Sequence, residues 1–139
     1  MGFVQLGDDI NGPGKNDRWG GDVSISDDGS IIAVAGASSH FGSIRVFEYK
    51  DNHWNSLIDL GDIKINQGYN SLSISSDGGY VAVGNPYSQN SGRARLWGPL
   101  TEESQRELEI TGGGNTSRSN QITWGNNSGD YFGSDISLS

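Results

Sequence analysis

The strongest constraint on the fold of this chain is a phrase that recurs at a fixed spacing. Residues 23–34 read VSISDDGSIIAV, and residues 72–83, 49 positions further on, read LSISSDGGYVAV. Near the C-terminus, residues 135–139 (DISLS) restart the phrase as residues 22–26 (DVSIS) begin it. A fixed period of this length, built from strand-like units, is typical of solenoids and propellers. The repeat therefore indicates a fold class, and it says little about a ligand.

Each repeat is predicted to contain four antiparallel strands. In the first, apolar and small polar residues alternate over 23–26, and Asp27-Asp28-Gly29 has the composition of a tight hairpin turn. The second repeat follows the same plan, with its turn at Ser76-Asp77-Gly78. The expected strands cover residues 23–26, 31–34, 44–49 and 54–63, then 72–75, 80–83, 92–97 and 107–110.

Four antiparallel strands in about 50 residues describe a β-propeller blade. The predicted fold is all-β: a single partial propeller over 1–139, with about two blades and the first strand of a third. The repeats fall at 3–53 and 54–111, followed by a loop over 112–121 and an incomplete third repeat over 122–139. Residues 3–6 are expected to form an outer strand. A two-sheet sandwich is the structural alternative, but a sandwich does not require this period.

Side-chain size predicts which residues lie between neighbouring sheets. Small residues would let two sheets approach one another, and larger apolar residues would fill the opposite face of each sheet. The small set is Ser24, Ser26, Ala33, Ser73, Ser75 and Ala82, and the large set is Val23, Ile25, Leu72 and Ile74.

Two propeller families have phrases similar to those of this chain. Trp19-Gly20 and Phe132-Gly133 each precede a predicted inner strand, and the segment 129–139 (GDYFGSDISLS) resembles the FG-GAP repeat of integrin α-chain-like propellers. The resemblance covers most of the chain outside 100–121, although Gly68-Tyr69 stands where a second Phe-Gly would be. Ser75–Gly78 and Ala94–Trp97 instead resemble WD-repeat phrases, without that family's Gly-His and Trp-Asp pairs. Both resemblances imply a propeller, and the first is the better match.

Composition narrows the set of partners. The net charge is −8 and no cluster of Lys and Arg occurs, so the chain has no electrostatic footprint for nucleic acid and does not suit an anionic membrane surface. The absence of cysteine excludes disulfides and thiolate chemistry but assigns no compartment. Glycine accounts for 22 of 139 residues, which fits a chain rich in turns.

Several polar residues are candidates for chemistry, and each has a simpler structural explanation. FG-GAP blades commonly bind calcium in a loop of spaced Asp residues. The turns at Asp27-Asp28-Gly29 and Ser76-Asp77-Gly78 are too short to alternate carboxylates, so we expect turn geometry to explain them. The remaining expectations are a solvated acidic group (Asp8, Asp9, Asp17, Asp22), solvent-facing arginines at matching strand positions (Arg45, Arg95), isolated histidines without a carboxylate partner (His40, His53), and buried tryptophans (Trp19, Trp54, Trp97).

No nucleophile–base pair, metal set or phosphate loop stands out, so the sequence predicts no catalytic, cofactor or metal site. The expected function is a non-catalytic binding or scaffold module that recognises a protein or glycan through propeller loops. The alternative is a fragment of a propeller hydrolase whose catalytic residues lie on other blades. Because propellers need at least about four blades, we also expect either a piece of a longer propeller or a homo-oligomer that completes a ring.

Overall fold

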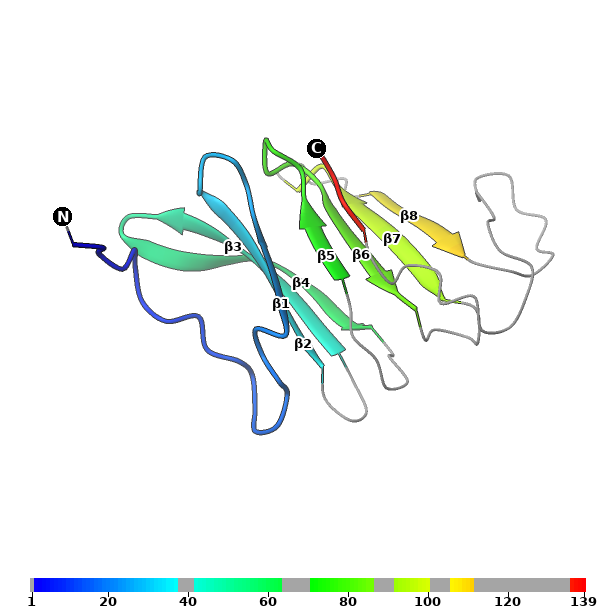
Figure 1. Cartoon of the computed structure of the whole chain (residues 1–139), viewed down its shortest axis with the longest axis horizontal. Coiled ribbons are helices and arrows are strands. Elements are labelled where there is room, and N and C mark those ends of the chain that lie inside the picture. Colours follow the sequence, from blue (N-terminus) through cyan, green and yellow to red (C-terminus); the bar gives the residue numbers. More distant parts are fainter. Residues whose placement is uncertain (1, 38–41, 64–70, 87–91, 101–105, 112–135) are drawn as a thin grey trace.

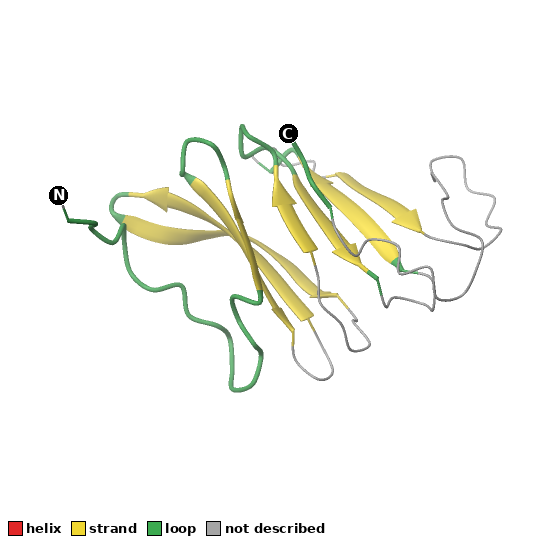
Figure 2. Ribbon diagram, in the orientation of Figure 1, coloured by secondary structure: helices red, strands yellow, loops and turns green. Residues whose placement is uncertain are grey.

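The chain folds into two antiparallel four-stranded β-sheets (Figures 1 and 2). The computed structural model describes residues 2–37, 42–63, 71–86, 92–100, 106–111 and 136–139. The first sheet has the strand order β1-β2-β3-β4, with bounds Asp22–Ile25, Ile31–Ala37, Gly42–Lys50 and His53–Ile63. The second has the order β5-β6-β7-β8, with bounds Ser71–Ile74, Val81–Asn85, Arg93–Gly98 and Arg106–Thr111. No helix occurs among these residues. The all-β prediction and the eight strands predicted for the two complete repeats are confirmed.

The two sheets share one hairpin design. In the first, the Ser26 amide donates to the Ile31 carbonyl at 2.9 Å, and in the second the Ser75 amide donates to the Tyr80 carbonyl at 3.0 Å. Each hairpin then turns through a glycine with positive φ, Gly29 at 73° and Gly78 at 72°. A left-handed backbone conformation carries a steric cost for residues with a Cβ, which explains the Asp-Gly sequence in both turns.

Each sheet has two distinct faces because side chains alternate along a strand. The register of the first sheet defines a front face (Val23, Ile25, Ile32, Val34, Arg45, Phe47) and a back face (Ser24, Ile31, Ala33, Ala35, Ile44, Val46). The second sheet has the equivalent front face (Leu72, Ile74, Val81, Val83, Arg95, Trp97) and back face (Ser73, Ala82, Ala94, Leu96).

The back face of the first sheet packs on the front face of the second. The buried core joins Ile31, Ala33, Ala35, Ile44 and Val46 from one sheet to Leu72, Ile74, Val81, Val83 and Trp97 from the other. Full burial of one such aliphatic side chain contributes about 1.5–3 kcal/mol, so this interface is the main source of stability. The two sheets therefore pack with unlike faces in contact.

Side chains of β1 also bond the backbone edge of β5. The Leu72 amide donates to Asp22 Oδ2 at 2.6 Å, and the Ile74 amide donates to Ser24 Oγ at 2.9 Å. The same contact recurs one repeat later, where the Leu138 amide donates to Ser73 Oγ at 2.8 Å. Ser24 and Ser73 thus hold the same position relative to the strand that follows each of them.

Three local predictions are wrong. Residues 3–6 do not form a strand, and Phe3 and Val4 are exposed. This segment is held by a side chain instead, since Trp54 Nε1 donates to the Leu6 carbonyl at 3.0 Å. Residues 136–139 lie beside β5 without strand pairing (Figure 1). Val23 and Ile25 belong to the predicted face, but that face is open at β1 and leaves them exposed.

Candidate functional site

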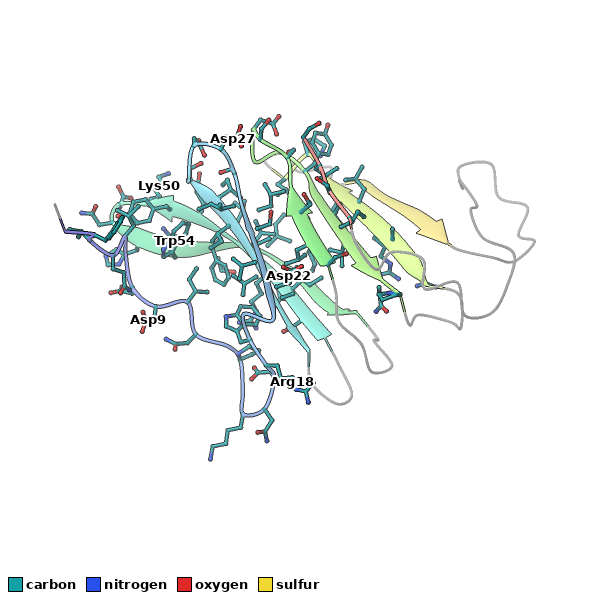
Figure 3. The ribbon with its side chains drawn as sticks, viewed as in Figure 1. Asp9, Arg18, Asp22, Asp27, Lys50 and Trp54 are labelled. Atoms are coloured by element: carbon teal, nitrogen blue, oxygen red, sulfur yellow. The ribbon has the colours of Figure 1, made fainter. Side chains whose placement is uncertain are left out.

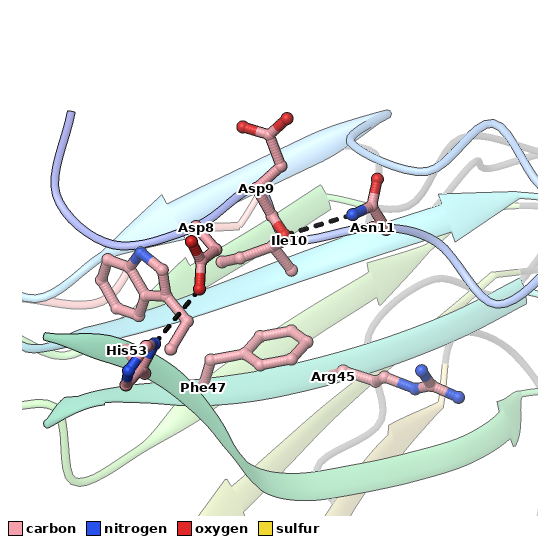
Figure 4. Close-up of a pocket in the computed structure, with 8 residues that line it drawn as sticks. Asp8, Asp9, Ile10, Asn11, Arg45, Phe47 and His53 are labelled. Atoms are coloured by element: carbon pink, nitrogen blue, oxygen red, sulfur yellow. Dashed lines mark hydrogen bonds and ion pairs between the residues drawn. The ribbon is translucent and has the colours of Figure 1, made fainter. Parts of the chain in front are cut away.

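A half-open pocket of about 230 Å³ lies between the N-terminal segment and the strands β3 and β4 (Figure 4). Its wall combines charged, amide, imidazole and aromatic side chains: Asp8, Asp9, Ile10, Asn11, Arg45, Phe47, His53 and Trp54. The N-terminal segment runs across the front face of the first sheet before it enters β1 (Figure 3). The pocket therefore belongs to the first sheet alone.

Two indole rings fix the N-terminal segment in place. Trp19 Nε1 donates to the Ile10 carbonyl at 2.9 Å, while Trp54 Nε1 donates to the Leu6 carbonyl. Close packing against these rings requires glycine at two positions. A Cβ on Gly12 would lie 2.6 Å from Trp19 Cβ, and one on Gly7 would lie 3.0 Å from Trp54 Cδ1. The backbone of residues 6–12 is thereby held against the sheet.

Strand β3 supplies the floor of the pocket. Arg45 and Phe47 are two residues apart, so both project from the front face. The guanidinium carbon of Arg45 lies 5.9 Å from the Trp19 ring centroid, and Arg45 Nε is 3.0 Å from Asp59 Oδ2. The Phe47 ring meets Trp19 edge-on, with a centroid separation of 6.5 Å. These contacts fix the orientation of the Arg45 side chain.

His53 and Asp8 form a polar pair at the mouth of the pocket. His53 Nδ1 lies 3.1 Å from Asp8 Oδ2, and the two side chains are 66% and 84% exposed. Beside them, Asn11 Nδ2 donates to the Asp9 carbonyl at 3.3 Å. Because both side chains are largely exposed, they can contact a ligand at the mouth of the pocket.

The sequence prediction missed this pair. His53 was expected to have no carboxylate partner and Asp8 to be solvated loop charge, but 45 residues separate them and no local pattern links them. The other expected acidic residues are also engaged. Asp17 Oδ2 accepts from the Gly14 amide at 2.7 Å, and Asp22 bonds β5. His40 lies outside the described residues.

The Asp-Gly turns are stabilised by their own carboxylates. Asp28 Oδ1 accepts from the Ser30 amide at 2.9 Å and from the hydroxyls of Ser26 and Ser30 at 2.7 Å each. These hydrogen bonds, with the Ser30 amide foremost, lower the pKa of Asp28 to about 2. The hydroxyl of Ser75 and the amide of Gly79 likewise lower the pKa of Asp77. Turn geometry thus accounts for both carboxylates, and the described residues contain no cluster of three metal-ligating side chains.

The matched arginines lie over aromatic rings. The guanidinium carbon of Arg95 is 5.9 Å from the Trp97 ring centroid, the same distance as from Arg45 to Trp19. Both arginines lie on front faces and are intermediate in exposure, so they are less exposed than expected. Trp97 is buried as predicted, and Trp19 and Trp54 are partly buried.

No known protein family matches the chain, and no curated protein or solved structure has significant similarity to it. In the part of the chain that the structure describes, no helix is long and apolar enough to cross a membrane. The pocket and the stacked sheets are therefore the observations on which a functional proposal depends.

Proposed function

We propose that this chain is a non-catalytic binding module, made of two successive propeller blades, that binds a glycan in the pocket between its N-terminal segment and β3. The observation that carries the proposal is the pocket lining, which sets hydroxyl-binding polar groups beside aromatic rings. The blade arrangement and the resemblance to FG-GAP repeats remain part of the same proposal.

The direction of sheet stacking supports the propeller. Successive blades around an axis must bury unlike faces, the back of one on the front of the next, and the two sheets here do so. A single closed sandwich instead joins two inner faces and leaves both outer faces free. The Leu138 amide bonds Ser73 as the Ile74 amide bonds Ser24, which supports the same direction of stacking at residues 136–139.

The chemistry of the pocket suits a neutral sugar. Asp8 can accept hydrogen bonds from hydroxyl groups, and Arg45 and Asn11 can donate them. The Asp9 carboxylate already accepts from Gln5 Nε2 at 2.9 Å. Phe47 and Trp54 supply apolar surface for the C–H face of a sugar ring. A volume of about 230 Å³ is below the range of roughly 300–1,000 Å³ for drug-sized ligands, so we expect one sugar unit inside and the rest of the glycan in solvent.

The same lining argues against a hydrolytic triad in this part of the chain. A hydrolytic triad requires a nucleophile beside the base, and the lining contains no Ser, Thr or Cys next to the Asp8–His53 pair. A fragment of a propeller hydrolase is the alternative function, and its signature would be turnover of the bound glycan.

Backbone amide NMR during titration with a panel of neutral oligosaccharides tests this function. We expect shifts confined to residues 8–11, 45–47 and 53–54. Replacement of Asn11 by alanine should weaken binding about 2- to 12-fold, the loss expected for one hydrogen bond. Lys15→Ala, on an exposed residue outside the pocket, is the matched control and should bind normally. Saturable shifts elsewhere, or none across the panel, would contradict the proposal, and released sugar would favour the hydrolase.

A further inference from the structure

The front face of the first sheet is open at β1, which is an edge strand of that sheet. Val23 and Ile25 are 48% and 53% exposed, whereas their equivalents Leu72 and Ile74 are 7% and 5% exposed beneath the first sheet. The N-terminal segment covers the outer part of this face around Phe47. The uncovered part is therefore the patch that a preceding sheet of the same repeat would occupy.

The backbone of β1 is open at the same edge. Hydrogen-bonded and non-bonded pairs alternate in an antiparallel ladder. The Ser26 amide pairs with Ile31 across the hairpin. The Ile25 amide therefore faces away from β2, as the Ile74 amide faces away from β6. In the second sheet that amide donates to Ser24 of the first sheet. In the first sheet, the described residues provide no such acceptor for Ile25.

The hairpin turns show the same asymmetry. A Cβ added to Gly78 would lie 2.8 Å from Ile31 Cγ1 of the first sheet, but one added to Gly29 would meet nothing within 4 Å. The Asp27 amide bonds the Ser76 carbonyl of the following turn at 3.1 Å, which joins the two turns. Ile31 of the first sheet therefore fills the space next to Gly78, whereas the equivalent space next to Gly29 is empty.

The C-terminal segment provides the complementary group. Leu138 bonds Ser73 as Ile74 bonds Ser24, so residues 136–139 take the place of the inner strand of a third repeat. Ser137 then corresponds to Ser24 and Ser73, the two hydroxyls that accept an amide from the next inner strand. Ser137 is exposed. The described residues therefore carry an acceptor, Ser137, on one side of the two sheets and an open donor, the Ile25 amide, on the other.

We infer that a second copy of this chain docks on β1, with its Ser137 hydroxyl accepting a hydrogen bond from the Ile25 amide and its residues 136–139 lying along β1 beside Val23 and Ile25. The contact is head-to-tail, because the donor edge and the acceptor segment are different surfaces. Such heterologous contacts produce rings when the rotation closes and open filaments when it does not. The inference is independent of the glycan pocket, whose lining does not include β1 or residues 136–139.

Sedimentation velocity over a range of concentrations tests the inference. We expect the 139-residue chain to self-associate as its concentration rises. Ile25→Lys places a charge on the open patch, and Ser137→Lys does so on the acceptor segment. Each variant alone should remain monomeric with an unchanged circular dichroism spectrum. Val4→Lys, at an exposed site in the N-terminal segment, is the control and should associate like the parent chain.

A mixing experiment distinguishes head-to-tail docking from other contacts. Ile25→Lys retains an intact acceptor segment and Ser137→Lys retains an intact β1 edge, so an equimolar mixture should form dimers and nothing larger. A parent chain that stays monomeric at millimolar concentration would overturn the inference and leave β1 to a different partner. So would a mixture without dimers, or equal loss of association in Val4→Lys.

Discussion

At the scale of single residues, the carboxylate of Asp28 makes folding stability depend on pH. Its folded pKa is about 2, below the ordinary value of 3.8, because the ionised form accepts three hydrogen bonds in the turn. A group with a lowered folded pKa stabilises the native state above its unfolded pKa. This contribution is lost as the pH falls from about 4 to about 2.

Asp28→Asn should therefore lower the melting temperature by a few degrees at pH 7. The difference in melting temperature between the variant and the parent chain, the gap, should narrow below pH 4. Asp27→Asn is the matched control, since Asp27 is the exposed neighbour in the same turn and its carboxylate makes none of these hydrogen bonds. Thermal melts followed by circular dichroism from pH 7 to pH 3 provide the measurement. A gap that stays constant with pH would show that the carboxylate charge is not the cause.

At the scale of elements, the two hairpin turns are alike internally and differ in their surroundings. Gly29→Ala should cost about 1–2 kcal/mol, because alanine is strained at the positive φ of this turn. Gly78→Ala carries the same strain and adds a clash with Ile31 of the neighbouring sheet, so its cost should be larger by about 1–3 kcal/mol. Urea denaturation of both variants at low protein concentration measures the difference. Equal costs would mean that the second turn does not pack against the first sheet.

The sequence predicted these elements well because they depend on local patterns. Alternation and the Asp-Gly turns placed all eight strands, and the offset between repeats paired Ser24 with Ser73 as equivalent positions. The pocket could not be predicted in this way. It depends on a segment without periodicity, which two indole rings hold against the sheet, and on the contact between Asp8 and His53 across 45 residues. The exposure of Val23 and Ile25 was missed because the repeated sequence predicts which face of the sheet these side chains project from. It does not predict whether another sheet covers that face.

At the scale of the whole molecule, one repeat position has two environments. Ile25 and Ile74 are equivalent in sequence, but the second is 5% exposed between the sheets and the first is 53% exposed on the open front face. Replacing a buried isoleucine with alanine lowers the free energy of unfolding by about 2–5 kcal/mol, whereas surface substitutions usually change it by less than about 0.5 kcal/mol. The position of a repeat in the stack, rather than its sequence, therefore sets the cost of the same substitution.

We expect Ile74→Ala to destabilise the dilute monomer by about 2–5 kcal/mol and Ile25→Ala by less than about 0.5 kcal/mol. Because the interface joins both sheets in one core, amide hydrogen exchange in Ile74→Ala should accelerate in β2 and β3 as well as in β5 and β6. Acceleration confined to the second sheet would show that the sheets unfold independently. Raising the concentration of the parent chain should slow exchange at the Ile25 amide, whereas Ile25→Lys should remove the concentration dependence from the neighbouring amides of β1.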